Sequence, residues 1–142
     1  DRSGAYNLNR LSNIIARPGA DLSALLAILN SELLQWLFST RFLDYEIKPV
    51  YLRSCPLPQQ MSDRLGALAE QQRELHAAAL LGTDQESGRG WERRAALDRQ
   101  IDEEVYDAYK VTTPERQLIR AQLDGLRPAA GAAPAPGVAA RR

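Results

Sequence analysis

The chain has 142 residues, of which 44% are hydrophobic, and its 18 basic and 18 acidic residues give a net charge of zero. This length allows one domain, or a small domain with an appendage. A neutral chain has no overall basic field that would indicate nucleic acid or an anionic membrane as partner, although a local basic face stays possible. The longest apolar stretch is about fourteen residues, short of the roughly twenty that span a bilayer, so we expect no membrane segment.

The single cysteine, Cys55, excludes an intrachain disulfide and favours a reducing, cytoplasmic location. The chain begins at Asp1 without an initiator methionine or a signal peptide. We therefore expect it to be a piece of a larger protein.

Residues 1–60 predict a small strand-helix-strand unit. Residues 11–15 fit a short strand that ends at a Pro-Gly turn, and Asp21 is placed to cap a helix over 22–38. That helix is apolar nearly all round, so it belongs in a core or an interface. Residues 47–53 predict a second strand, which Pro49 restricts to a sheet edge.

Residues 61–126 have purely helical patterns. Apolar residues spaced three and four apart over 61–79 form one seam, and a similar stripe recurs over 91–109. With a polar loop over 82–90, the two segments predict an antiparallel hairpin that buries Leu97, Ile101 and Val105 against Leu65, Leu68 or Leu75. A third helix is expected from Thr113 to Gly125. The Ala/Pro/Gly-rich tail, 127–142, is expected to be disordered. The predicted fold class is thus α+β, mostly α.

We find no catalytic constellation in the sequence. The lone His76 has no companion nucleophile or acid, Cys55 is interpreted as a bland buried thiol, and no set of metal ligands can be assembled. Asp44, Glu46 and Lys48 superficially match the acid-x-acid-x-Lys pattern of metal-dependent nucleases, but a solvated strand face is the favoured interpretation. The carboxylates at 102–104 and 107 are likewise interpreted as a solvated helix face.

Basic residues of the first sixty positions lie near predicted turns and strand ends, where a rigid helix could present them to phosphates and base edges. The candidate nucleic-acid-binding residues are Arg10, Arg17, Arg41, Lys48 and Arg53.

Three segments, in order, resemble the C-terminal target-recognition region of TaqI-like adenine-specific DNA methyltransferases and of the related type IIG restriction–modification enzymes. Residues 29–34, LNSELL, resemble the Leu-Asn-Ser-x-Leu helix of that region, and residues 51–58, YLRSCPLP, resemble its Leu-Pro-Ile-Pro strand end. Residues 101–109, IDEEVYDAY, with the following Thr112, Thr113 and Glu115, resemble its terminal signature. Lys110 departs from that signature, which has glycine there, and Ala108 stands where leucine is usual.

The resemblance implies a C-terminal, non-catalytic part of a larger enzyme, with a Rossmann-like, S-adenosylmethionine-dependent domain upstream. The methyltransferase tetrapeptide Asn/Asp-Pro-Pro-aromatic is absent from this chain, which implies that the fragment itself needs no cofactor. It would bind and position double-stranded DNA beside the upstream methyltransferase domain. Whether the parent also cleaves DNA stays open.

The alternative is a helical interaction or oligomerisation module without a nucleic-acid role, associating through Leu65, Leu68 and Leu75. Under either interpretation, an apolar 22–38 helix separated from its partner domain would leave apolar surface exposed. We therefore expect the fragment to self-associate through Trp36, Leu37 or Phe38.

Overall fold

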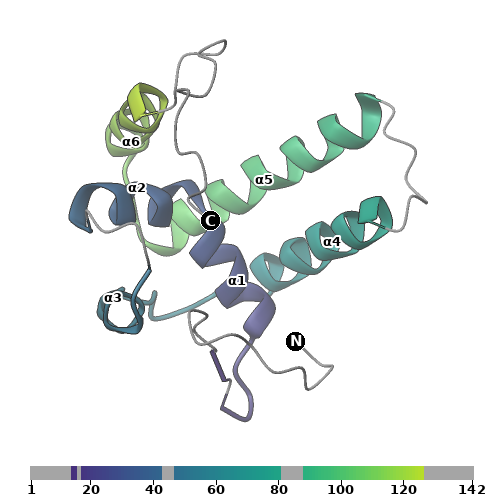
Figure 1. Cartoon of the computed structure of the whole chain (residues 1–142), viewed down its shortest axis with the longest axis horizontal. Helices are drawn as coiled ribbons and strands as arrows, with labels where there is room; N and C mark the ends of the chain where they lie inside the picture. Colours follow the sequence, from purple (N-terminus) through teal and green to yellow (C-terminus); the bar gives the residue numbers. More distant parts are fainter. Residues whose placement is uncertain (1–13, 16, 43–46, 81–87, 127–142) are drawn as a thin grey trace, which may run out of the picture.

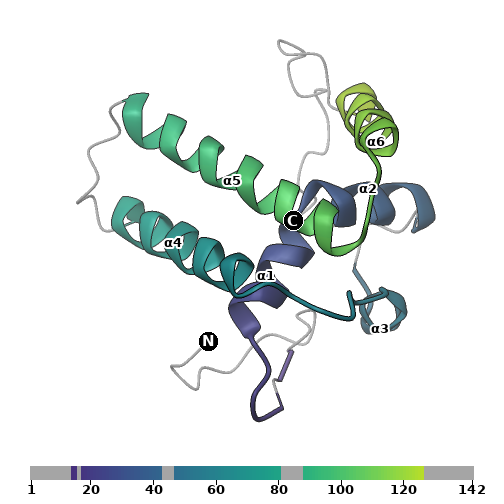
Figure 2. The same cartoon turned by 180° about the vertical axis from the view of Figure 1, so that it is seen from behind.

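The computed structural model describes residues 14–15, 17–42, 47–80 and 88–126, and over these ranges the chain is all-α. Figures 1 and 2 show the arrangement from opposite sides. The helices are α1 (Leu22–Asn30), α2 (Glu32–Arg41), α3 (Pro49–Ser54), α4 (Asp63–Leu80), α5 (Gly88–Ala108) and α6 (Thr113–Leu126). The described ranges contain no strand, so the predicted α+β class is wrong.

Residues 47–53, predicted as an edge strand, instead lead into and form most of α3. Pro49 is the first helical residue, where its fixed φ suits the helix and its missing N–H costs nothing. The backbone N–H of Tyr51 donates to the Lys48 carbonyl at 2.9 Å, closing the first turn. Of the other predicted strand, only Ile14 and Ile15 are described, and both are exposed without regular structure.

The helix predicted over 22–38 is in fact two helices, α1 and α2, bent by 57° at Ser31. The Ser31 hydroxyl donates to the Ile28 carbonyl at 2.7 Å and accepts from the Leu34 N–H at 3.4 Å, while its backbone is extended. One buried serine therefore ends α1 and caps α2. The Asp21 cap is confirmed, because its carboxylate accepts from the N–H groups of Ser23 and Ala24 at 2.9 and 3.0 Å.

No single helix in the described ranges is long and apolar enough to cross a membrane, and α1 with α2 reaches that length and composition only as a bent pair.

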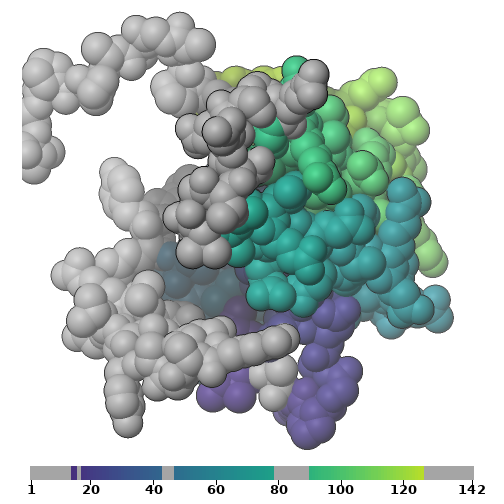
Figure 3. All heavy atoms as spheres, turned by 90° about the vertical axis from the view of Figure 1, so that its right-hand side faces the viewer, coloured from purple at the N-terminus to yellow at the C-terminus, as the bar shows by residue number. Residues whose placement is uncertain are grey.

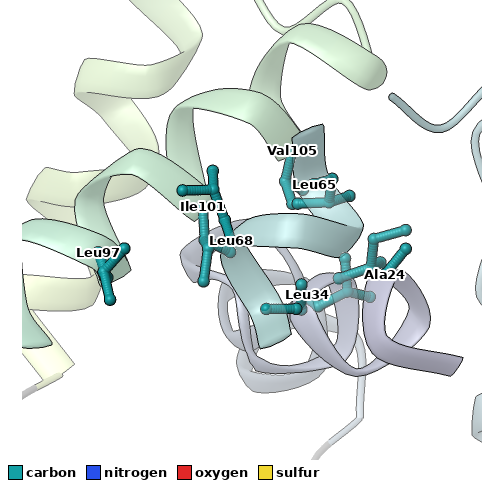
Figure 4. Close-up of a cluster of buried hydrophobic side chains, with 10 residues drawn as sticks. Ala24, Leu34, Leu65, Leu68, Leu97, Ile101 and Val105 are labelled. Carbon is teal, nitrogen blue, oxygen red and sulfur yellow. The ribbon is translucent and has the colours of Figure 1, made fainter. Parts of the chain in front are cut away.

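The antiparallel hairpin of α4 and α5 is confirmed, and α1 packs across it (Figure 1). Leu97, Ile101 and Val105 of α5 are buried with Leu65 and Leu68 of α4, as predicted. Figure 4 shows these side chains converging with Ala24 of α1 and Leu34 of α2. The core therefore joins residues from both sides of the boundary predicted at residue 60.

Close packing of α1 on α4 depends on a glycine. Gly66 is buried against the start of α1, and a Cβ at this position would collide with the Asp21 carboxylate. The absence of a side chain therefore lets α4 approach the N-terminal cap of α1.

The turn from α5 to α6 is a Schellman motif with a lysine in the left-handed position. Lys110 has φ 57°, its N–H donates to the Asp107 carbonyl at 3.0 Å, and the Val111 N–H donates to the Tyr106 carbonyl at 2.9 Å. Helix α6 then begins at Thr113. The Glu115 carboxylate accepts from the Thr112 N–H at 2.7 Å, so Thr112 is the residue that caps α6.

The tail 127–142 and most of the predicted 82–90 loop lie outside the described residues, and α5 begins within that loop at Gly88.

Candidate nucleic-acid interface

An aromatic cluster joins the end of α2 to α3. The rings of Phe42 and Tyr51 stack with centroids 4.2 Å apart and an interplanar angle of 16°, and Phe38 meets Phe42 in a tilted contact at 5.4 Å. All three side chains are half-buried. The short helix α3 is thus held to the C-terminal end of α2 by ring contacts.

Two of the predicted basic residues lie on this cluster. The Arg41 guanidinium carbon is 5.8 Å from the centroid of the Phe42 ring, and the Lys48 ammonium is 5.7 Å from that of Tyr51. Such placements give a weak cation–π attraction, and both side chains are exposed to solvent. Arg53 adds an exposed cation in the last turn of α3. We name these three basic residues, with Phe42 and Tyr51, the α3 surface.

The remaining two candidates are not part of the α3 surface. Arg17 is exposed in the turn before α1, where its carbonyl accepts from the Ala20 N–H at 3.1 Å. Arg10 lies outside the described residues. The structure therefore brings together three of the five predicted residues, on one short segment.

Contacts behind the α3 surface tie it to α5. The Tyr109 hydroxyl donates to the Pro56 carbonyl at 2.7 Å, and burial raises the pKa of Tyr109 to about 12. The half-buried Cys55 thiol donates to the Tyr51 carbonyl at 3.3 Å. Burial raises the pKa of Cys55, and Arg41 offsets only part of this effect. The thiol is thus protonated near neutral pH and suited to packing rather than to nucleophilic attack.

The α5 carboxylates, interpreted from sequence as a solvated face, each have a partner. They fan around the helix as expected, but Glu104 pairs with Arg64 at 3.0 Å, Asp107 pairs with Arg116, and Glu103 pairs with both Arg116 and Arg120. The sequence interpretation missed these contacts because the partners lie on α4 and α6. Spacings of four residues, 103 to 107 on α5 and 116 to 120 on α6, were the available signal.

Asp102 and Glu32 form a polar junction between α2, α5 and α6. An Asp102 carboxylate oxygen accepts from the Glu32 N–H at 2.8 Å, capping the start of α2 from another helix. The Glu32 carboxylate accepts from the Tyr106 hydroxyl at 3.2 Å and from the Arg120 guanidinium at 3.0 Å. The guanidinium groups of Arg116 and Arg120 both lie 5.3 Å from the Tyr106 ring centroid.

Electrostatics at this junction favour protonated forms. Burial raises the pKa of Asp102 to about 6, and the neighbouring carboxylates of Glu32 and Asp98 add to the rise, while the Glu32 N–H and Arg120 oppose it. Burial, followed by the charge of Glu32, also raises the pKa of Tyr106. Asp102 thus caps α2 with its carboxylate. Burial destabilises the charged form of this carboxylate more than the N-terminus of α2 stabilises it, so the net effect on the pKa is a rise.

A cleft of about 790 Å³ opens beside this junction, between α1, the start of α2, and the α4–α5 hairpin. Asp98, Asp102 and Glu32 contribute carboxylates to its lining, and Trp91 and Leu26 contribute apolar surface. The exposed His76 also lines the cleft. The sequence patterns gave no sign of this cleft because its walls come from four helices.

The described residues offer no metal centre: they contain no group of three or more His, Cys, Asp and Glu side chains that could hold an ion. Of the nuclease-like pattern, Asp44 and Glu46 lie outside the described residues, and Lys48 caps a helix instead of lying in a strand. Lys48 is therefore not part of the strand that the nuclease-like pattern requires.

Comparison with known proteins found no match to any protein family, curated protein or solved structure. Any assignment of function therefore depends on the residues themselves.

Proposed function

We propose that the chain is a non-catalytic part of a DNA-modifying adenine methyltransferase of the restriction–modification type, and that it helps to bind and position target DNA through the α3 surface. S-adenosylmethionine would be bound by the parent's upstream methyltransferase domain and not by this segment. The observation that carries the proposal is the placement of Arg41 and Lys48 on the Phe42–Tyr51 stack, with Arg53 exposed on the same short helix as Tyr51.

Charge and shape at the α3 surface suit a nucleic-acid backbone. Cations that flank half-buried rings stay accessible to phosphates, while the ring stack and the contacts with α5 restrain the segment that carries them. Arg41 lies in the last turn of α2, where the negative end of the helix dipole stabilises a positive charge. The neutral net charge of the whole chain predicts weak binding, concentrated on this surface.

Contacts between distant motif residues also support the resemblance. Residues 29–34 and 101–109 are two of the three segments that resemble the methyltransferase region, and they meet at one junction: Glu32 receives hydrogen bonds from Tyr106, and its N–H donates to Asp102. The two segments thus have a joint structural role, which holds α2 to α5. It also predicts that these acidic residues do not touch DNA.

The alternative, oligomerisation through Leu65, Leu68 and Leu75, is less well supported. Leu65 and Leu68 are 1% and 5% exposed within a single chain, and Leu75 packs partly buried against the same core. Self-association through this seam would require opening the hairpin. Trp36, Leu37 and Phe38 are half-buried, so self-association through them stays a prediction.

DNA binding can be tested by fluorescence anisotropy with a labelled duplex of about 20 base pairs at low salt. We expect weak binding whose affinity falls steeply with salt, since phosphate contacts release counterions. Replacing Arg41 and Lys48 together by alanine should weaken binding and reduce the salt slope by about two, one for each lost phosphate contact.

The matched control is the double replacement of Arg93 and Arg99 by alanine, which removes the same charge from exposed positions of α5. If both double variants lose affinity equally, binding is unspecific attraction to any cation, and the α3 surface has no special role. If the chain does not bind DNA at any salt concentration, the proposal fails for this segment on its own.

A further inference from the structure

The cleft between α1, α2 and the α4–α5 hairpin has an acidic floor. Asp98 and Asp102 are four residues apart on α5 and so share one helix face, and Glu32 approaches from the start of α2. Asp98 accepts a hydrogen bond from Gln72, and one oxygen of Asp102 accepts from the Glu32 N–H. Within the described part of the chain, the second Asp102 oxygen, Oδ2, accepts no hydrogen bond.

Cations that line the cleft do not neutralise this floor. Arg73 directs its guanidinium to Glu70, with contacts of 2.6 and 3.0 Å. Arg99 is exposed and also lines a second hollow on α5, which places it at the rim between the two. Arg120 of α6 does not line the cleft, and its guanidinium is engaged by Glu32 and Glu103. Among the described residues, no cation forms a direct ion pair with the Asp102 carboxylate. Burial raises its pKa, and the charge of Arg120 offsets only part of that rise.

Among the residues that line the cleft, two large apolar side chains are unusually exposed. Trp91 is 70% exposed and Leu26 47% exposed, and both line the cleft together with Ala95. Tryptophan is the residue type most enriched at interface hot spots, and its ring face attracts guanidinium groups. A volume of about 790 Å³ is in the range of ligand sites and exceeds the needs of one side chain.

We propose that this cleft binds a short segment of a partner polypeptide that carries an arginine, with the guanidinium on Asp98 and Asp102 and the neighbouring apolar residues against Trp91 and Leu26. Arginine suits the site better than lysine, because its planar fork can bridge two acceptors and can stack on an indole. The carboxylates would repel a phosphate, so this site differs in ligand from the α3 surface, with which it shares no residue. The proposal does not depend on the DNA-binding role.

The probe is a synthetic peptide, acetyl-Ala-Leu-Arg-Ala-Leu-amide, titrated into the ¹⁵N-labelled full chain while the two tryptophan indole N–H signals are followed by NMR. The spectrum of a Trp36→Phe variant assigns the Trp91 signal. We expect a saturable shift of the Trp91 signal and about fivefold weaker binding of the same peptide with citrulline, which has the shape of arginine without its charge. One partly desolvated ion pair, at about 1 kcal/mol, gives this factor.

Two variants separate the acidic floor from general charge. Asp98→Asn should weaken the arginine peptide about threefold to fivefold, whereas Glu92→Gln, an exposed carboxylate of α5 that does not line the cleft, should change affinity by less than about twofold. Circular dichroism checks that both variants are folded. The proposal is overturned if the citrulline peptide binds equally well, if Asp98→Asn binds like the unmodified chain, or if millimolar peptide leaves the Trp91 signal unmoved.

Discussion

Replacing Asp102 by asparagine should make the protein more stable at neutral and higher pH. The side chain is half-buried, and its carboxylate caps α2 through the Glu32 N–H at 2.8 Å. Asparagine can accept the same hydrogen bond through its amide oxygen but carries no charge to bury. The substitution thus separates the capping hydrogen bond from the cost of desolvating the ion.

The magnitude follows from the pKa of Asp102, which burial raises from 3.8 to about 6. That difference corresponds to about 3 kcal/mol in favour of the protonated carboxyl, and solvent screening at a half-exposed group reduces it to about 1–2 kcal/mol. Because the pKa in the folded state is above that of the unfolded state, the carboxyl imposes no penalty below about pH 4. The penalty grows as the pH rises from about 4 to about 6, between the two pKa values, and is complete above about pH 7.

Urea denaturation followed by circular dichroism at pH 4, 6 and 8 measures the effect as a difference between two proteins. We expect the free energy of unfolding of Asp102→Asn to match the unmodified chain at pH 4 and to exceed it by about 1–2 kcal/mol at pH 8. As a control, Asp102→Ala removes the acceptor and should lack about 1 kcal/mol of capping stabilisation, relative to Asp102→Asn, at both extremes. If Asp102→Asn is instead destabilised at pH 8, the charge–dipole attraction at the start of α2 outweighs burial, and the reasoning is wrong.

Three further substitutions test local features of the fold by the same denaturation assay. Lys110→Gly should raise the free energy of unfolding by about 0.5–1 kcal/mol, because the left-handed φ of 57° strains any residue with a Cβ; a loss of stability would contradict this. Ile101→Ala should cost about 2–5 kcal/mol, since the side chain is 4% exposed in the hairpin core, and a cost below 1 kcal/mol would mean that the site repacks. Ser31→Ala should cost about 0.5–2 kcal/mol by removing a shared helix cap, and an unchanged midpoint would show that the bend does not need the hydroxyl.

The α4–α5 hairpin could be predicted because its signals are local. Apolar residues repeat at helical spacing along both segments, and the residues expected to be buried, Leu97, Ile101 and Val105, are buried. The Asp21 cap could also be predicted from the sequence, since an aspartate immediately before an apolar helix has few other roles. Where side-chain preference and burial pattern agree over several turns, sequence alone was sufficient.

The break at Ser31 and the helix α3 were missed for a common reason. The apolar pattern runs without interruption through Ser31 because both helices bury apolar residues near the bend, Ile28 before it and Leu34 after it. At Pro49 the same residue fits an edge strand or a first helical turn, and a run of seven residues is too short for periodicity to decide. Contacts with the rest of the fold decided both cases.

The candidate sites depended on such contacts even more. Arg41 and Lys48 flank one aromatic stack because α3 is a helix folded against the end of α2. The predicted strand would not have placed them together. The cleft near Trp91 and Asp98 is likewise built from four helices and has no counterpart in any single segment. Residue types suggested the chemistry, whereas their grouping required the tertiary structure.

Helix α2 connects the acidic junction of Glu32 and Asp102 with the α3 surface. Its N-terminus is capped by Asp102 of α5 and linked to α6 through Glu32 and Arg120, and its C-terminus carries Arg41 and, next to it, Phe42 of the α3 surface. Because both ends of a ten-residue helix are engaged, the direction of the α3 surface relative to the hairpin is set by the acidic junction. The acidic junction therefore holds one end of the helix whose other end carries Arg41.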